Sequence, residues 1–175
     1  MILAHKIALD PNDVQETYFR KAAGTARFAY NWALDPWQHQ YDAWKNDPTL
    51  PKPSEAALRR QLNAMKHEAF PWMLEVIKNA PQMAIMHLGQ AFKNFFQGIA
   101  DYPTFKKKGR HDSFALTNDH FTVKGQKVHI PKLGWVQMHE SLRERQSAVG
   151  HHLPDRESLV LKCHRRGPRS ARSPP

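Results

Sequence analysis

The sequence has few of the features that place a protein in a membrane, outside the cell or around a structural metal. Its 175 residues contain no run of about 18 apolar side chains, so no transmembrane helix is expected. The stretch from Met1 to Lys6 lacks a charged region followed by an apolar one, which argues against a secretory signal. The single cysteine, Cys163, excludes an internal disulfide and a zinc site built from several thiolates of this chain.

Motifs of the common catalytic sites are also missing. There is no G-x-S-x-G motif, no glycine–lysine phosphate-binding loop and no G-x-G-x-x-G motif. The acidic residues are scattered along the sequence, so we expect no cluster of carboxylates that could bind the metal ions of a nuclease. His151, His152 and His164 match no structural zinc spacing with Cys163. We therefore expect no catalytic residue, bound metal or other cofactor in this chain.

Positive charge, by contrast, is abundant and unevenly distributed. The 26 lysines and arginines exceed the 16 acidic residues, which gives a net charge of +10. Residues 1–100 carry only +2, whereas residues 101–145 and 146–175 carry +4 each. Such an excess indicates a polyanionic partner, most often nucleic acid and less often a membrane surface. We expect DNA or RNA and no membrane partner.

Residues 11–100 predict a bundle of helices. Asp10 as N-cap and Pro11 at the first helical position should start the first helix, which Pro36 should end or kink. Ser54 should cap a second helix. A third helix should begin at residues 79–81, with the strongest apolar stripe of the sequence continuing to Ile99.

Strand patterns occur at the N-terminus and after residue 101. An apolar strand is expected within residues 2–9, and residues 121–130 alternate around a Lys124-Gly125 turn, which is typical of a hairpin. Further strands are expected at 113–117 and 135–138. The order allows the first strand to join the later ones, with the helices inserted between. The predicted fold class is α+β, with a small antiparallel β unit.

The last part of the chain has a different composition. Residues 143–175 are rich in Arg, Ser and Pro and show no periodicity. A segment of this kind cannot bury enough apolar area to offset the entropy lost on ordering. We expect a disordered basic tail.

The segment 102–111 combines aromatic and basic residues. Tyr102 and Phe105 precede four cations in five positions, namely Lys106, Lys107, Lys108 and Arg110. A mobile loop of this composition could follow a phosphate backbone while its aromatic rings stack on bases. The alternative is a solvated surface run, but Lys124, Lys127 and Lys132 of the predicted β unit add further cations nearby.

Four segments resemble the N-terminal part of TnpB, the OrfB-type transposase of bacterial insertion sequences and a relative of the type V CRISPR effectors. These are FRKAAGTARFAYNW (19–32), AFKNFF (91–96), YPTFKKK (102–108) and PKLGWV (131–136). The resemblance covers about residues 1–142. Descriptions of this family also name the N-terminal region a helix-turn-helix.

The resemblance implies a wedge-type β-barrel formed by residues 1–10 and 101–142, with a recognition-type helical domain, residues 11–100, inserted in it. It also implies two partners, a guide RNA copied from the transposon end and a short DNA motif beside the target. The place implied for the protein is the bacterial cytoplasm, in association with the nucleoid.

The resemblance also assigns roles residue by residue. Lys78, Gln82, Thr117 and Asn118 correspond to positions that contact the motif DNA, a role that suits amide and ammonium groups. The residues that would face RNA or the guide–target duplex are Tyr102, Phe105, Lys106, Lys107, Lys108, Arg110, Lys124, Lys127 and Lys132.

The family pattern continues beyond what this sequence contains. Full-length members carry a RuvC-like nuclease domain with three acidic magnesium ligands, interrupted by a four-cysteine zinc ribbon. This sequence ends at Pro175, and its tail resembles out-of-frame translation. The hypothesis is a truncated or frameshifted copy that does not cleave DNA by itself. The alternatives are complementation by a separate nuclease portion, a stand-alone DNA-binding regulator of transposition, and a poorly folding relic.

Overall fold

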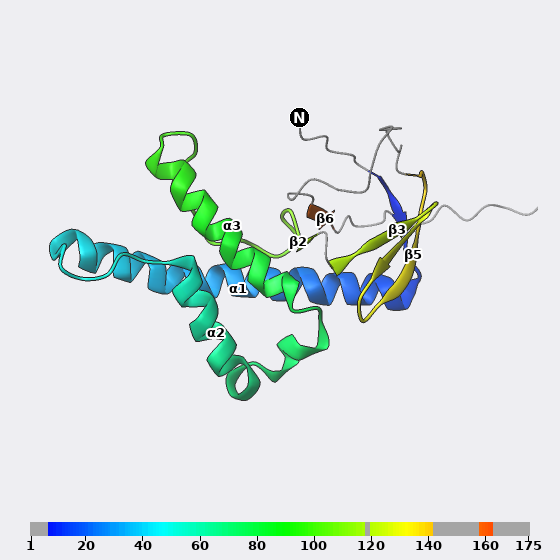
Figure 1. The fold of residues 1–175 in the computed structure, drawn as a ribbon, viewed down its shortest axis with the longest axis horizontal. Helices are drawn as coiled ribbons and strands as arrows, with labels where there is room; N and C mark the ends of the chain where they lie inside the picture. Colours follow the sequence, from blue (N-terminus) through cyan, green and yellow to red (C-terminus); the bar gives the residue numbers. More distant parts are fainter. Residues whose placement is uncertain (1–6, 118–119, 142–157, 163–175) are drawn as a thin grey trace, which may run out of the picture.

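The computed structural model describes residues 7–117, 120–141 and 158–162, and its fold is α+β as predicted (Figure 1). The helices are α1 (Asp13–Asn46), α2 (Glu55–Ala69), the short 3-10 helix η1 (Pro71–Glu75) and α3 (Asn79–Phe96). The strands are β1 (Leu9–Asp10), β2 (Ser113–Thr117), β3 (Thr122–Lys124), β4 (Lys127–Ile130), β5 (Gly134–Met138) and β6 (Ser158–Lys162). No helix in these ranges has the length and apolar content needed to cross a bilayer.

Helix α1 begins and ends at positions that differ from the prediction. Asn12 is the N-cap: its side chain accepts a hydrogen bond from the Gln15 amide, and the Gln15 side chain accepts one from the Asn12 amide. This reciprocal pair satisfies free amides at the helix start, so the helix begins at Asp13 and not at Pro11. Pro36 does not end the helix. The ring of Trp37 beside it is buried and stacked on Phe92, and this packing offsets the hydrogen bond that proline removes.

Helices α2 and α3 follow the predicted starts, and α3 crosses α1 in Figure 1. Ser54 is the N-cap residue of α2, although its side chain makes no capping hydrogen bond. Helix α3 ends earlier than predicted, at Phe96, because Gly98 adopts a φ of +70° and its amide donates to the Phe95 carbonyl. Ile99, predicted to extend the apolar stripe, therefore lies beyond the helix and is exposed.

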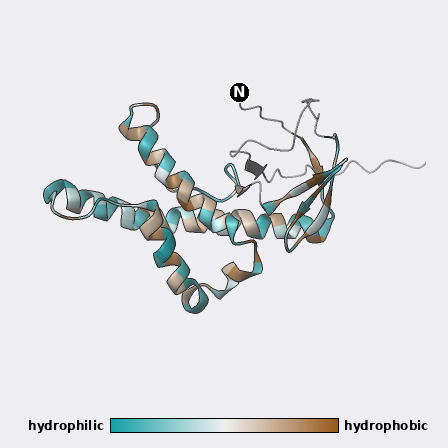
Figure 2. Cartoon of the chain, in the orientation of Figure 1, coloured by the Kyte–Doolittle hydropathy of each residue, from teal (hydrophilic) through white to brown (hydrophobic). Residues whose placement is uncertain are grey.

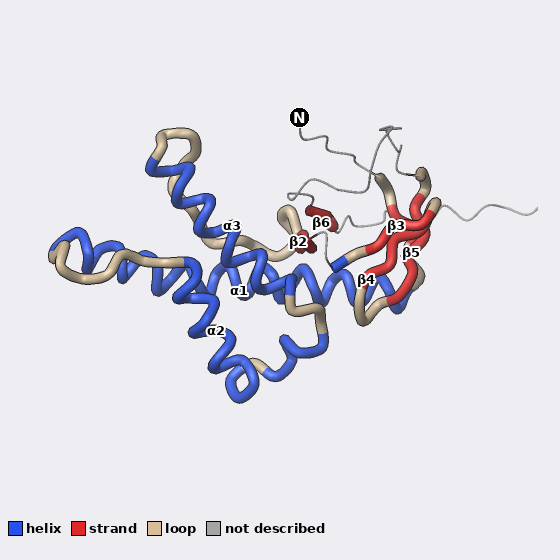
Figure 3. Tube along the Cα trace, in the orientation of Figure 1, coloured by secondary structure: helices blue, strands red, loops and turns tan. Residues whose placement is uncertain are grey.

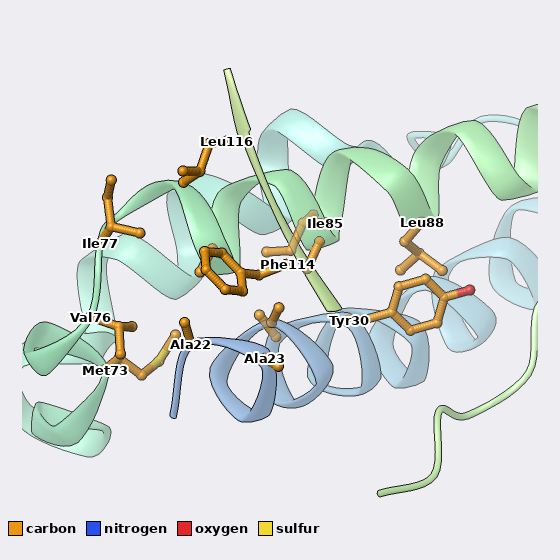
Figure 4. Close-up of a cluster of buried hydrophobic side chains, with 14 of the residues drawn as sticks. Ala22, Ala23, Tyr30, Met73, Val76, Ile77, Ile85, Leu88, Phe114 and Leu116 are labelled. Atoms are coloured by element: carbon orange, nitrogen blue, oxygen red, sulfur yellow. The ribbon is translucent and has the colours of Figure 1, made fainter. Parts of the chain in front are cut away.

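A central part of the core lies between α1, α3 and β2 (Figure 4), and the same cluster of buried residues extends to α2 and to the strands β4 and β5. Helix α1 contributes Ala22 and Ala23, whose small side chains let α3 and β2 approach closely. The larger side chains of this part of the core include Ile85 and Leu88 of α3 and Phe114 and Leu116 of β2. Figure 2 shows hydrophilic residues over much of α2 and the adjacent end of α1, although Leu58 and Leu62 of α2 belong to the core.

The main sheet has the strand order β1-β5-β4-β3 and is antiparallel throughout (Figure 3). A first strand joins the later strands as predicted, because Leu9 is paired with Met138, and β3 and β4 form the predicted hairpin. This strand is Leu9–Asp10, so Asp10 belongs to the strand and not to the helix start, and residues 2–6 of the predicted strand lie outside the described residues. The expected closed barrel is wrong. Closure requires the two edge strands to pair, whereas β1 and β3 are two- and three-residue edges of an open sheet, and β2 pairs with β6 in a separate sheet.

The C-terminal segment also departs from the expectation of disorder at one place. Ser158–Lys162 forms β6, which runs antiparallel to β2 with Ser113 opposite Lys162. The physical reason is its apolar run at 159–161, which favours a strand and suits pairing with the buried strand β2. Residues 143–157 and 163–175 lie outside the described residues, so the prediction for them stays a prediction.

Candidate nucleic-acid interface

The start of α3 brings together three of the four residues predicted to contact motif DNA. Lys78 precedes the helix and is exposed, and Gln82 lies in its first turns and is partly exposed. Thr117 ends β2 and is held against this helix start, because the Asn79 Nδ2 donates a hydrogen bond to its Oγ1 at 2.9 Å. Asn118 lies outside the described residues.

Asn79 is the residue that creates this arrangement, and the sequence reasoning did not single it out. Its side chain is buried, with 4% of the residue exposed. The Thr117 hydroxyl also lies 3.0 Å from the His120 Nδ1, so both neighbours hold it in place. Thr117 therefore positions the end of β2, while Lys78 and Gln82 present their side chains at a helix N-terminus, where the helix dipole favours anions.

The basic loop after α3 is attached to α1 and is not the free loop that its composition predicts. The Asn31 side chain donates from Nδ2 to the Lys106 carbonyl at 2.9 Å and accepts from the Lys106 amide at 2.8 Å. The ammonium of Lys106 lies 4.1 Å from the centre of the Tyr30 ring. These contacts hold the backbone and the side chain of Lys106 on one face of α1.

The ionisable groups at this attachment have shifted pKa values. Desolvation lowers the pKa of Lys106, although the residue as a whole is exposed, because its ammonium lies against an aromatic ring. Desolvation also raises the pKa of Tyr30. For His87 on α3, desolvation and then the charge of Lys106 lower the pKa, although the residue as a whole is exposed.

A second attachment closes the far end of the loop. The Arg27 Nη1 lies 2.5 Å from the Asp112 Oδ1, and both side chains are only 21% exposed. The other oxygen of Asp112 accepts a hydrogen bond from the Gly109 amide at 2.9 Å. Between the two attachments Lys107 and Arg110 are exposed, as is Lys108, so these three cations are available to a partner.

The two aromatic residues of this segment differ in their surroundings. Tyr102 packs edge-on against Phe92 and Phe95, with ring centroids 5.4 and 5.0 Å apart. Phe105 is 52% exposed. Tyr102 thus also covers the end of α3, whereas Phe105 has more of its ring open to a stacking partner.

The three lysines predicted on the β unit also separate into two kinds. Lys124 and Lys127 are exposed and stand opposite each other at the end of the β3–β4 hairpin. Lys132 instead donates from Nζ to the Leu74 carbonyl at 2.5 Å and to the Val76 carbonyl at 3.2 Å. Its ammonium therefore joins the β4–β5 turn to the end of η1, and its phosphate-binding role stays a prediction.

Sequence reasoning missed the residues that hold the loop, namely Arg27, Asn31 and Asp112. Arg27 and Asn31 lie four residues apart, within the 19–32 segment, and so share a face of α1. This spacing indicates that Arg27 and Asn31 could bind the same segment of the chain, but it does not indicate which loop packs against that face of α1. The partners became apparent only in three dimensions.

Metal ligands do not converge anywhere in the described part of the chain. No three His, Cys, Asp or Glu side chains come close enough there to hold an ion.

Comparison with known sequences shows what this chain is similar to. Residues 1–46 match the helix-turn-helix domain family of OrfB proteins of the IS605 type. Of the matched residues, 7–46 fold as β1 and the single helix α1.

A relative in Escherichia coli (strain K12), named "Putative RNA-guided DNA endonuclease InsQ", is 30% identical over 140 residues. The alignment covers 79% of this chain and 34% of the relative, so the chain spans about a third of that protein's length. Together with the four sequence segments, these matches support a TnpB/OrfB-type N-terminal region.

Proposed function

We propose that this region binds nucleic acid as the recognition part of a transposon-encoded protein of the TnpB/OrfB type, contacting a short DNA motif and a guide RNA. The observation that carries the proposal is the Asn79–Thr117 hydrogen bond, which gathers Lys78, Gln82 and the end of β2 at one helix start. A net charge of +10 supplies the long-range attraction to a polyanion.

The chemistry of this helix start suits duplex DNA. The Gln82 amide can both donate to and accept from a base edge in a groove, and Lys78 can bind a phosphate or the acceptor edge of guanine. The N-terminal end of α3 adds the partial positive charge of the helix dipole. In this proposal Gln82 reads the motif, and Lys78 supplies phosphate affinity.

The RNA-binding part of the proposal uses the exposed cations between the two loop attachments. Lys107, Lys108 and Arg110 are held at a defined place because the loop is tied to α1 at Lys106 and Asp112. A fixed basic loop can follow a phosphate backbone at a lower entropic cost than a mobile one. The open sheet and the three helices are proposed to correspond to the wedge and recognition parts of the family. Cleavage is assigned to none of the described residues.

The test uses the purified chain and a pool of DNA duplexes with a randomised short segment, with and without RNA transcribed from the transposon end. We expect selection of one short motif, and a Gln82→Ala variant that loses much of this preference. Lys78→Ala should weaken binding to all sequences and reduce the salt slope by about 1. Gln90→Ala, an exposed position on the same helix that bonds to Asn94, is the matched control.

Two results would contradict the proposal. Unchanged motif preference in Gln82→Ala would remove Gln82 from the interface, and an affinity that stays flat as salt rises would remove phosphate binding altogether. Motif selection that needs no RNA would instead support the stand-alone regulator of transposition.

A further inference from the structure

The outward face of the open sheet has a composition that differs from an ordinary solvated surface. On β4 and β5 the inward side chains are buried, namely Val128, Ile130, Val136 and Met138. The alternate residues form the outward face, which consists of Thr122 and Lys124 on β3, Lys127 and His129 on β4, and Trp135 and Gln137 on β5. The sheet lies at the end of the molecule where α1 begins (Figure 1).

Trp135 is the largest side chain of the outward face, and 45% of it is exposed. It is paired across the strands with His129, and the two ring centroids lie 5.2 Å apart with an angle of 59° between the rings. Its backbone is held in place from α1, because the Gln15 Nε2 donates to the Trp135 carbonyl at 2.9 Å. An exposed indole ring that packs beside a partly buried imidazole on a fixed backbone is a platform on which a flat apolar ring can stack at little entropic cost.

Positive charge lies in the next row of the same face. Lys124 stands opposite Lys127, and Lys127 stands opposite Gln137. Like charges directly across a pair of strands destabilise the sheet unless an anion lies between them. Asp10 on β1 stands opposite Gln137, at the far edge of this row. The lysine end of the row is therefore complementary to phosphate.

The two rows are close enough to contact a single nucleotide chain. Residues two apart on a strand are separated by about 7 Å, and neighbouring strands by about 4.8 Å. A base stacked on Trp135 would thus leave its phosphates within reach of the long side chains of Lys124 and Lys127. In a duplex the faces of the bases are covered by their neighbours, so stacking of this kind requires an unpaired base.

We infer that the outward face of the sheet binds a single-stranded stretch of nucleic acid, with an unpaired base on Trp135 and its phosphates on Lys124 and Lys127. This inference rests on the proposed nucleic-acid-binding function and assigns to this face a ligand form that differs from the duplex motif at α3. Trp135 and His129 were not among the residues predicted to bind RNA or DNA.

The experiment measures the affinity of the full chain for labelled twelve-nucleotide oligouridine and oligothymidine, and for a blunt duplex, by fluorescence anisotropy. Trp135→Ala should weaken single-strand binding by about 5- to 150-fold, the range reported for removing one base-stacking aromatic ring. Trp135→Phe should restore most of the affinity. The matched control is Trp72→Ala on η1, since Trp72 is 42% exposed and has no predicted contact with nucleic acid.

The expected pattern also includes the charges and the duplex. A Lys124→Ala, Lys127→Ala double variant should reduce the salt slope of single-strand binding by about 1.4, the single-strand value for two phosphates. Equal losses in the Trp135→Ala and Trp72→Ala variants would overturn the inference, as would an unchanged affinity in Trp135→Ala or a failure of Trp135→Phe to restore binding. Circular dichroism and urea denaturation show whether each variant is folded.

The test of single-strand binding by the sheet can fail or succeed independently of the test of duplex binding at the start of α3. Loss of motif selection in Gln82→Ala with intact single-strand binding would locate the two ligands on two surfaces. If Gln82→Ala has no effect on motif selection while Trp135→Ala abolishes single-strand binding, the duplex proposal fails and the inference about the sheet stands.

Discussion

The attachment of the basic loop to α1 can be tested by replacing Asn31 with alanine. This change removes the hydrogen bonds of 2.9 and 2.8 Å to the carbonyl and the amide of Lys106. It leaves the ion pair between Arg27 and Asp112 intact. The loop should therefore be released at one end while the helices and the sheet keep their structure.

The magnitude follows from the two bonds. A hydrogen bond contributes about 0.5 to 1.5 kcal/mol net, and these two lie at the surface, where water can replace them. We expect the free energy of local opening to fall by about 1 to 2 kcal/mol, which raises the population of the open loop about 5- to 30-fold. The free energy of global unfolding should fall by no more than about the same 1 to 2 kcal/mol, because the unfolded chain also lacks these two bonds and the core does not include this loop.

Limited trypsin digestion under native conditions measures the effect directly. Lys107 and Lys108 are exposed, and cleavage beside them depends on opening of the loop when reclosing is faster than cutting. The rate should rise about 5- to 30-fold in Asn31→Ala, with the product identified by mass spectrometry. Asn63→Ala is the control, since Asn63 is an exposed residue of α2 that bonds only locally, to Lys66.

The reasoning would be refuted if the cleavage rate at this loop were the same in the wild type and in Asn31→Ala. An equal rise in Asn63→Ala would also refute it, since that change does not touch the loop.

Three further predictions concern other contacts. Lys132→Met removes two charged hydrogen bonds to carbonyls at the end of η1, so it should lower the free energy of unfolding in urea by about 1–3 kcal/mol. The salt slope of nucleic-acid binding should not change in this variant. A slope lower by about 1 would show that Lys132 contacts a phosphate instead. Gly89→Val should lower the free energy of unfolding by about 1–3 kcal/mol and reduce the melting temperature, because a Cβ added at Gly89 would lie 3.0 Å from the Glu55 Cβ. An unchanged melting temperature would contradict close packing of α2 on α3. Desolvation and the charge of Lys106 lower the pKa of His87 in the folded protein, so the unfolded chain binds a proton at His87 more tightly. The contribution of neutral His87 to the free energy of unfolding is therefore fully present above pH 6.5 and is lost as the pH falls through the pKa of the folded state. In His87→Gln the difference between the urea midpoints at pH 7.5 and pH 5 should shrink, and an unchanged difference would contradict this.

Local patterns predicted much of the secondary structure. The second and third helices begin where Ser54 and residues 79–81 indicated, and the hairpin around Gly125 follows its turn signal. These features depend on capping, periodicity and turn chemistry, which act over a few residues and can be identified in the sequence alone. Pro36 shows where such rules fail, because burial of the neighbouring Trp37 against a distant helix outweighs a local helix breaker.

The candidate surface was predicted in part for the same reason. Residue type and charge identified Lys78, Gln82 and the basic loop, but not what holds them. The roles of Asn79, Asn31 and Lys132 come from contacts with residues 38, 75 and 58 positions away in the chain, respectively. No local rule specifies such pairings, because many polar residues of the sequence could have made them.

The sequence by itself determined that the chain is basic, and it indicated an α+β fold and a similarity to TnpB/OrfB-type proteins, since composition, periodicity and sequence segments are properties of the chain in order. The tertiary structure decided that the sheet stays open, that the basic loop is tied to α1 and that Trp135 and His129 share one outward face with two lysines. The physical reason is that strand pairing and loop attachment depend on the relative free energies of long-range contacts, which are set only when the whole chain has packed.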